Sequence, residues 1–298
     1  MTINNVAIIG AGVQGTMLIY RNAVYGKSVN VYEIVEEVIE SSKRKILLWL
    51  NNDISSGKIN KDEMENIFSR ISYCSEIGEA ISDADIVIEN VPEKLEVKIS
   101  VWETIDKIAP PKTIITTNSS SLKSSSINPT IERKEKTFNI NFSTPNRDDM
   151  VEVMWNSNTS EVTKQAIFDY LNSINNVAIV TNKEIKGFSM NRVWRAMKKE
   201  CLYLWANGYT TPEDLDRAFM LEWGTNEGPF GVMDQVGLDT IWNIEMSYYQ
   251  ESQEEKDKPP QVLKDMVDRG ELGEKSGKGF YSWPNPIFRE TRWLRKND

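Results

Sequence analysis

Short apolar runs alternate with stretches of helical spacing in the first third of the chain. Residues 6–9 form an apolar run that ends in glycine, as buried parallel strands do, and residues 13–25 follow with the spacing of a helix. Residues 29–32 form the next strand-like run. This pattern predicts a strand, helix, strand unit at the N-terminus.

The same alternation continues, with one interruption, to about residue 181. Apolar residues at helical spacing over 35–53, a Ser55-Ser56-Gly57 break and a second helix from about Lys61 predict a helical hairpin inserted after the second strand. Further strands are expected at 85–89, 113–116, 137–142, 150–154 and 176–180, with helices at 93–107 and 161–173.

The pattern changes near residues 181–187, where strand-like runs stop. Residues 188–207 form a long amphipathic segment, Thr211-Pro212 is a typical helix start, and 237–249 predict another helix. The charged stretch 251–258 is most simply a solvated loop. We therefore expect two domains, residues 1–184 and residues 185–298, the second of them all-helical.

Composition disfavours several classes of partner but identifies none. The formal net charge of −9 disfavours nucleic acid, although backbone N–H groups can still hold an anionic cofactor locally. Two widely separated cysteines, Cys74 and Cys201, suggest neither a disulfide framework nor a metal site. With no signal sequence and no apolar run long enough to span a membrane, we expect a cytoplasmic protein.

The strongest chemical signal is the glycine turn that joins the first strand to the first helix. Gly10 permits a tight turn, Gly12 lets a pyrophosphate approach the backbone, and Gly15 lets helix and strand pack closely. The helix N-terminus, with Val13 and Gln14, completes the predicted phosphate site.

Glu33 selects between the two nicotinamide cofactors. It ends the second strand, where a carboxylate accepts hydrogen bonds from the adenosine ribose and repels a 2′-phosphate, and Ile34 to Glu37 include no compensating arginine. The sequence therefore predicts NAD and disfavours NADP.

Several ordered motifs resemble the 3-hydroxyacyl-CoA dehydrogenase family over essentially the whole length of the chain. Besides the glycine turn, they are residues 89–94 with Lys98, 117–122, 141–145 with 151–153, 187–192, 227–230 with 234–239, and 273–281. The resemblance implies an α/β fold: a Rossmann-type, mostly parallel sheet with the inserted helical hairpin, followed by an all-α C-terminal domain for substrate binding and dimerisation.

The resemblance also implies roles for individual residues. Glu93 and Lys98 would lie near the nicotinamide ribose, and Asn118 would contact the cofactor. Ser120 would offer its hydroxyl to the reacting oxygen, because it precedes Asn141 by the interval expected between the family's serine and histidine. From the residues alone, these serines are equally a strand-to-helix cap.

Asn141 is the main departure from the family. The family has a histidine there, which takes the hydroxyl proton as hydride leaves for NAD, and the glutamate matching Glu152 orients that histidine. This chain contains no histidine at all. A side-chain amide can donate a hydrogen bond but has no accessible protonation change near neutral pH. Hydride transfer is compatible with Asn141, whereas proton transfer needs another source, with Glu152 as one candidate.

Other positions bear on the substrate. By resemblance Asn191 would touch the substrate carbonyl region, although an asparagine at a helix start is otherwise a cap or a surface residue. Thr144 replaces the family's usual asparagine, and the polar loop after it suggests an altered substrate. Lys186 is a proton-donor candidate or a solvated lysine, and Arg147 a carboxylate ligand or a local ion pair.

Two surface features complete the predictions. Residues 43–45 are a basic cluster that would meet a CoA or carrier-protein phosphate, or else form a solvated helix face. Trp194, Tyr203 and Trp205 are more consistent with core or dimer contacts than with ligand stacking. By resemblance we expect a homodimer through the helical domain.

Together these features favour an NAD-dependent oxidoreductase acting on the hydroxy, keto or imino group of a small acyl substrate, with catalytic residues Ser120, Asn141, Glu152 and Asn191. An imine is attractive because it can arrive already protonated. The alternative is an NAD-binding pseudoenzyme or regulatory module without turnover. A structural protein with no use for NAD is disfavoured, because it would not need the glycine turn, Glu33, Lys98 and Asn191 together.

Overall fold

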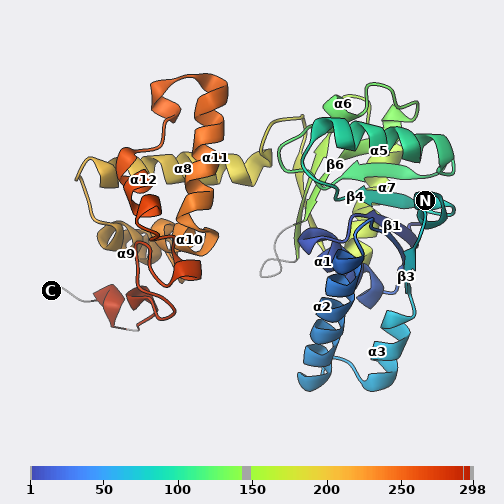
Figure 1. The fold of residues 1–298 in the computed structure, drawn as a ribbon, viewed down its shortest axis with the longest axis horizontal. Helices are drawn as coiled ribbons and strands as arrows, with labels where there is room; N and C mark the ends of the chain where they lie inside the picture. Colours follow the sequence, from blue (N-terminus) through green and yellow to red (C-terminus); the bar gives the residue numbers. More distant parts are fainter. Residues whose placement is uncertain (1, 143–148, 291, 296–298) are drawn as a thin grey trace. The chain divides into compact units, whose positions relative to one another are not determined.

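The structure is a computed structural model that describes residues 2–142, 149–290 and 292–295. The chain forms two compact units, Met1–Ser189 and Met190–Asp298 (Figure 1). The first unit contains the sheet, and the second is helical.

One sheet runs through the first unit in the order β3-β2-β1-β4-β5-β6-β7-β8. Its strands are β1 Asn5–Ile9, β2 Ser28–Tyr32, β3 Ile71–Cys74, β4 Ile86–Glu89, β5 Ile114–Thr117, β6 Thr137–Phe142, β7 Met150–Trp155 and β8 Val177–Thr181. Only β6 and β7 pair antiparallel; the other neighbouring pairs are parallel. The mostly parallel, Rossmann-type sheet confirms the predicted fold class.

Both faces of the sheet are covered by helices. These are α1 Val13–Val24, α2 Glu36–Ser55, α3 Lys61–Phe68, α4 Ile77–Ile81, α5 Leu95–Ile108, α6 Ser124–Ile127 and α7 Glu161–Ser173. Val6 and Ile8 of β1 enter one hydrophobic core, while Ala7 and Ile9 enter the other, which also contains Trp102 of α5. Because both faces are buried, the strand is apolar at every one of these positions.

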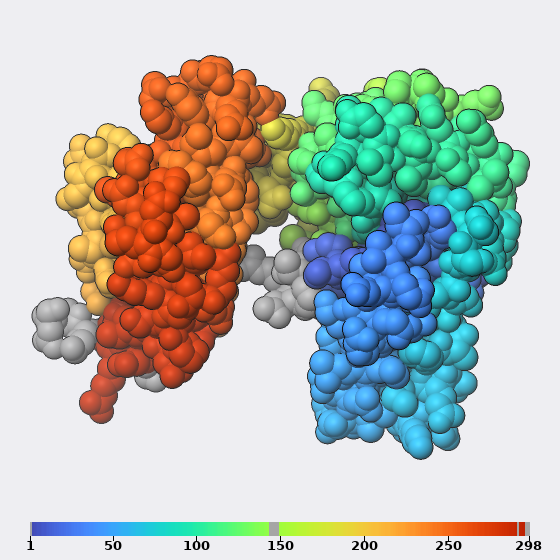
Figure 2. Space-filling view, in the orientation of Figure 1, coloured from blue at the N-terminus to red at the C-terminus, as the bar shows by residue number. Residues whose placement is uncertain are grey.

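The predicted helical hairpin is formed by α2 and α3. Its second helix begins with a capping box in which Asn60 and Glu63 each bond the other's backbone N–H. Figure 2 shows the hairpin, in light blue, as an extension of the first unit.

Among the strands and α-helices of the first unit, the sequence pattern missed three short ones: β3, α4 and the four-residue helix α6. β3 has four residues, of which only Cys74 is buried, so it lacks the continuous apolar run that marks the central strands. α4 has five residues, fewer than two helical turns, and gives too short a periodic signal to detect.

The second unit is built from α8 Phe188–Ala206, α9 Pro212–Trp223, α10 Pro229–Val236, α11 Leu238–Ser252 and α12 Gln261–Asp268. α8 begins at the end of the first unit and continues through the second. α10 and α12, eight residues each, were not predicted. Trp205 of α8 packs edge-on against Phe280 and Phe230, as expected for a core residue, while Tyr203 is exposed and lies beside Tyr209.

Two buried carboxylates hold the C-terminal segment onto these helices. Asp234 accepts hydrogen bonds from the backbone of Phe280 and Tyr281 and from the Trp283 ring, and Asp216 accepts one from the Tyr281 hydroxyl. The motifs at 227–239 and 273–281 therefore have a structural use in this chain. Within the described residues, no helix is both long and apolar enough to cross a membrane.

Candidate functional site

The glycine turn between β1 and α1 leaves open space at only one of its three glycines. A Cβ on Gly10, whose φ is +98°, would lie 2.7 Å from the Asn90 carbonyl oxygen, and one on Gly15 would lie 2.0 Å from the Gly10 carbonyl oxygen. A Cβ on Gly12 would meet nothing within 4 Å. Gly10 and Gly15 are thus required by the protein's own packing, whereas Gly12 keeps the approach to the turn open.

The same turn presents donors and acceptors that suit a dinucleotide. α1 starts after Gly12 without a side-chain cap or an acidic residue in its first turn, so its positive end is available to an anion. The Gln14 side-chain oxygen is buried and has no hydrogen-bond partner among the described residues. These observations fit a pyrophosphate and its attached groups.

Glu33 lies against this turn at the end of β2. One of its carboxylate oxygens accepts from Ala11 N at 2.9 Å, and the other accepts from Ile34 N and Val35 N at 2.9 and 3.0 Å. The three backbone donors fix the carboxylate beside the glycine turn. Each carboxylate oxygen has further lone-pair capacity, so Glu33 can still accept from a ribose hydroxyl.

Glu93 is held by a second polar cluster at the carboxyl ends of β4 and β5. Its Oε1 accepts hydrogen bonds from the Ser119 and Ser121 hydroxyls, and its Oε2 lies 3.2 Å from Lys98 Nζ. Burial raises the pKa of the Glu93 carboxyl, but the two serines and Lys98 outweigh it, so the pKa lies below its ordinary value. Glu93 is therefore positioned as an anion.

Lys98 is buried, with 1% of its side chain exposed, and its ammonium lies 2.7 Å from Glu89 Oε1. Lys98 is therefore a buried cation between Glu89 and Glu93, a role that the sequence did not indicate. Direct contact between Lys98 and the cofactor stays a prediction.

The three serines at 119–121 differ in their hydrogen bonding. Ser119 and Ser121 donate to Glu93, whereas Ser120, between them, is exposed and its hydroxyl has no partner among the described residues. Of the three hydroxyls, that of Ser120 is the one left for a ligand.

Asn118 joins the ends of three strands. Its side-chain nitrogen donates to Asn90 Oδ1 at 2.8 Å, and its oxygen accepts from Phe142 N at 3.0 Å. This ties the carboxyl end of β6, which carries Asn141, to those of β4 and β5. The predicted contact between Asn118 and the cofactor is not tested by these bonds.

Asn141 and Glu152 face each other across the antiparallel pair β6 and β7. Asn141 Nδ2 donates to Glu152 Oε2 at 3.4 Å, a long hydrogen bond, and the Ser189 hydroxyl donates to Glu152 Oε1 at 3.0 Å. Glu152 is 2% exposed. Each of its oxygens thus accepts a hydrogen bond from one of these two side chains. Ser189 lies inside the 187–192 motif, but no sequence pattern distinguished it from its neighbours.

Four remaining positions are less informative. Asn191 lies in the first turn of α8 within the second unit, and its role stays a prediction. Lys186 is half-buried. Thr144 and Arg147, with the loop that was expected to affect substrate choice, lie outside the described residues.

The basic cluster at residues 43–45 has a local explanation. Lys43 pairs with Glu40 at 2.8 Å and lies over the Tyr73 ring. This favours the solvated helix face over a phosphate site for Lys43.

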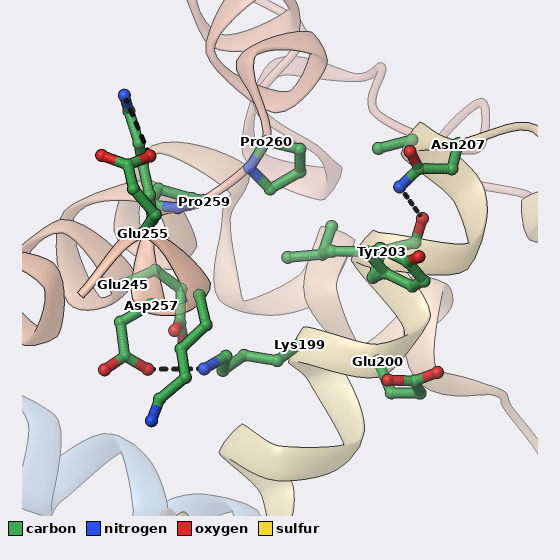
Figure 3. Close-up of a pocket in the computed structure, with 13 residues that line it drawn as sticks. Lys199, Glu200, Tyr203, Asn207, Glu245, Glu255, Asp257, Pro259 and Pro260 are labelled. Carbon is green, nitrogen blue, oxygen red and sulfur yellow. Dashed lines mark hydrogen bonds and ion pairs between the residues drawn. The ribbon is translucent and has the colours of Figure 1, made fainter.

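A pocket of about 380 Å³ lies within the second unit, between α8, α11 and residues 255–260 (Figure 3). Its wall contains an ion pair between Lys199 and Asp257, and Asp257 also accepts from Arg195. The stretch 251–258 is therefore not simply a solvated loop, because Asp257 anchors it to α8. None of the predicted site residues lines this pocket.

Comparison with known families decides the assignment. Residues 5–185 match the family described as 3-hydroxyacyl-CoA dehydrogenase, NAD binding domain, and residues 187–283 match 3-hydroxyacyl-CoA dehydrogenase, C-terminal domain. The chain belongs to the 3-hydroxyacyl-CoA dehydrogenase family. It is an NAD-binding oxidoreductase of that family, and NAD is its cofactor.

Relatives within the family differ in substrate. The chain is 31% identical over 284 residues to the probable 3-hydroxybutyryl-CoA dehydrogenase of Bacillus subtilis, covering 95% of this chain and 98% of the relative. It is 29% identical to a 5-formyl-3-hydroxy-2-methylpyridine 4-carboxylate 5-dehydrogenase of Mesorhizobium japonicum, covering 94% and 91%. The crystal structure of (S)-3-hydroxybutyryl-CoA dehydrogenase from Ralstonia eutropha matches with a TM-score of 0.86 at 26% identity, covering 95% of this chain and all of that one (100%).

Proposed function

We propose that this chain transfers hydride between NAD(H) and a small hydroxy, keto or imino acyl substrate, with Asn141 in the position of the family's catalytic histidine. The observation that supports this most strongly is the contact between Asn141 and Glu152 at the carboxyl edge of the sheet that carries the glycine turn.

NAD would be held by two groups of residues in the first unit. The pyrophosphate and adenosine side comprises Gly10, Gly12, Val13, Gln14, Gly15 and Glu33, and the nicotinamide side comprises Glu93, Lys98 and Asn118. When bound, NAD supplies a hydride acceptor or donor at its nicotinamide ring. The chain's own contribution is to fix Glu93 through Ser119 and Ser121 and to keep Ser120 available for the substrate.

Proton transfer is the step that Asn141 changes. A positioned general acid or base contributes roughly 10²–10⁴ in rate, and an amide cannot act as one near neutral pH. Glu152 is a titratable side chain that the structure places against Asn141. We assign it to hold Asn141, with Ser189 fixing its other oxygen, and to act as acid or base where the substrate requires one. Asn191 is assigned to the substrate carbonyl region.

The relatives' names differ in the whole substrate, including whether a CoA carrier is present. The Bacillus subtilis relative is named for an acyl-CoA and the Mesorhizobium japonicum relative for a free pyridine carboxylate. A CoA-linked, carrier-linked or free acyl compound is therefore consistent with the fold, and all three belong in the substrate panel.

An NADH fluorescence assay tests the proposal. Acetoacetyl-CoA and a panel of keto and imino acyl compounds are offered to the native protein, to Asn141→His and to Glu152→Gln. We expect turnover by the native protein and a loss of at least about tenfold in Glu152→Gln. Turnover that appears only in Asn141→His, with normal NAD binding by the native protein, would identify a pseudoenzyme and refute the proposal for these compounds.

We also propose a cytoplasmic homodimer that associates through the second unit. α9 carries the exposed side chains of Leu221 and Trp223, and Trp223 stacks on Phe219 with ring centroids 4.7 Å apart. Cys74 and Cys201 are free thiols, which suits a reducing compartment. Light scattering should give twice the chain mass for the native protein and the single chain mass for Leu221→Glu/Trp223→Glu; a native monomer would contradict the dimer.

A further inference from the structure

The orientation of the Asn141 amide restricts what the substrate can present to it. The nitrogen faces Glu152, and the reverse orientation would set the amide oxygen against a carboxylate oxygen, two acceptors in contact. Because an amide carries its oxygen and nitrogen on opposite sides of one carbon, Asn141 Oδ1 points away from Glu152. No residue in the described part of the chain donates to that oxygen.

Asn141 therefore offers an acceptor where a ketone oxygen needs a donor. A ketone oxygen can only accept hydrogen bonds, so it would oppose Asn141 Oδ1. An alcohol can donate to Oδ1, but its oxidation to a ketone requires the O–H proton to leave, and Asn141 cannot take it. The hydroxyl–ketone pair thus fits this amide in only one of its two oxidation states.

We propose that the group on the reacting carbon is nitrogen, so that the chain interconverts an amine and an iminium ion with NAD(H). This deepens the function proposed above and rests on it. Both states of such a substrate carry N–H groups, and both can donate to Asn141 Oδ1 and to the Ser120 hydroxyl oxygen. The histidine-to-asparagine change then matches the substrate without any loss of catalytic chemistry.

The electron and proton balance supports the same couple. When hydride leaves the carbon of a neutral amine, R₂CH–NH₂, the nitrogen lone pair forms the second C–N bond and the product is R₂C=NH₂⁺. Carbon is oxidised by two electrons, NAD⁺ is reduced to NADH, and no proton leaves nitrogen during the step. An ammonium substrate loses one proton to water beforehand. No general base is needed at position 141.

Glu152 supplies the charge that this couple requires. The iminium ion is a cation, and the Glu152 carboxylate lies behind the amide that would bind it, 2% exposed and fixed by Ser189 at 3.0 Å. A carboxylate in such a buried position favours a nearby cation more strongly than one in water does. The same carboxylate gives no such advantage to a neutral ketone.

A matched pair of compounds tests the proposal: 3-aminobutyryl-CoA and 3-hydroxybutyryl-CoA, which share carbon skeleton and carrier. Binding to the protein without NAD is measured by calorimetry near neutral pH, and NADH formation from NAD⁺ is measured at alkaline pH. We expect the amino compound to bind about tenfold more tightly or better, and to be the faster substrate. Glu152→Gln should abolish the binding preference.

Glu161→Gln is the control, because it removes the same charge from an exposed position on α7, where 87% of the side chain is accessible, and should keep the preference. The proposal stands only if the amino compound is preferred in both binding and NADH formation. NADH from the hydroxy compound alone would overturn it and leave the proposed oxidoreductase function standing. NADH from neither compound would overturn both for acyl-CoA substrates.

Discussion

Replacement of Lys98 by methionine should destabilise the first unit strongly. Lys98 Nζ lies 2.7 Å from Glu89 Oε1 and 3.2 Å from Glu93 Oε2, and the side chains of Lys98 and Glu89 are 1% and 0% exposed. Methionine keeps most of the side-chain length but leaves Glu89 as a buried carboxylate without its cation. Breaking a buried pair in this way typically costs about 3–5 kcal/mol.

Urea unfolding, followed by tryptophan fluorescence, measures this cost. Lys98→Met should lower the free energy of unfolding by about 3–5 kcal/mol, and Glu89→Gln/Lys98→Met should recover most of the loss, because the double variant removes both charges of the fully buried pair. Lys112→Met is the matched control: its partner is Asp85, but 48% of the Lys112 side chain is exposed, so its loss should cost under about 1 kcal/mol.

Two results would refute this reasoning. A loss under about 1 kcal/mol in Lys98→Met would show that Glu89 is stabilised without its lysine. A double variant no more stable than Lys98→Met would show that packing, and not charge, sets the cost.

Three further predictions concern the glycine turn, the adenosine side and the second unit. Gly15→Ala should destabilise the fold, because its Cβ would lie 2.0 Å from a carbonyl oxygen. Gly12→Ala should keep the stability of the native protein but bind NAD more weakly. Equal NAD affinity in Gly12→Ala would contradict the predicted pyrophosphate path. Glu33→Gln should weaken NAD binding and reduce discrimination against NADP in a fluorescence titration, and an unchanged NAD/NADP ratio would exclude Glu33 from that selection. Burial, opposed by hydrogen bonds from backbone N–H groups and a tyrosine, raises the pKa of Asp216 from 3.8 to about 6, so the folded state holds this proton more tightly than the unfolded state. Stability should therefore fall as pH rises from about 4 to about 6, by about 3 kcal/mol from this group, and Asp216→Asn should lack that slope; a parallel pH profile in the variant would contradict it.

The elements that the sequence alone predicted are those with a strand-like run, a helical period or a clear cap. β6 spans Thr137–Phe142, as the strand-like run indicated, and α7 and the start of α9 also agree with their periodicity and with the Thr211-Pro212 cap. β3 and α4 are too short to establish a period. Each is positioned by contacts with elements distant in the sequence: β3 pairs with β2, and α4 contacts β1 and β2.

The candidate site shows a similar division. The glycine turn and Glu33 could be predicted because strand, turn and helix follow one another along the chain. The clamp on Glu93 by Ser119 and Ser121 could not, since it joins residues 26 and 28 positions apart through side-chain rotamers. Likewise, the bond from Ser189 to Glu152 spans 37 positions and depends on how β7 and the start of α8 meet.

Hydride transfer itself is the central claim, and isotopic labelling tests it most directly. The protein is incubated with NADH carrying deuterium at the transferable position, together with the keto and imino acyl panel, and products are examined by mass spectrometry. We predict one deuterium on the carbon that bears the reacting group, with the largest yield from imino compounds and a reduced yield in Glu152→Gln. Bound NADH that transfers no deuterium to any compound in the panel would contradict the account.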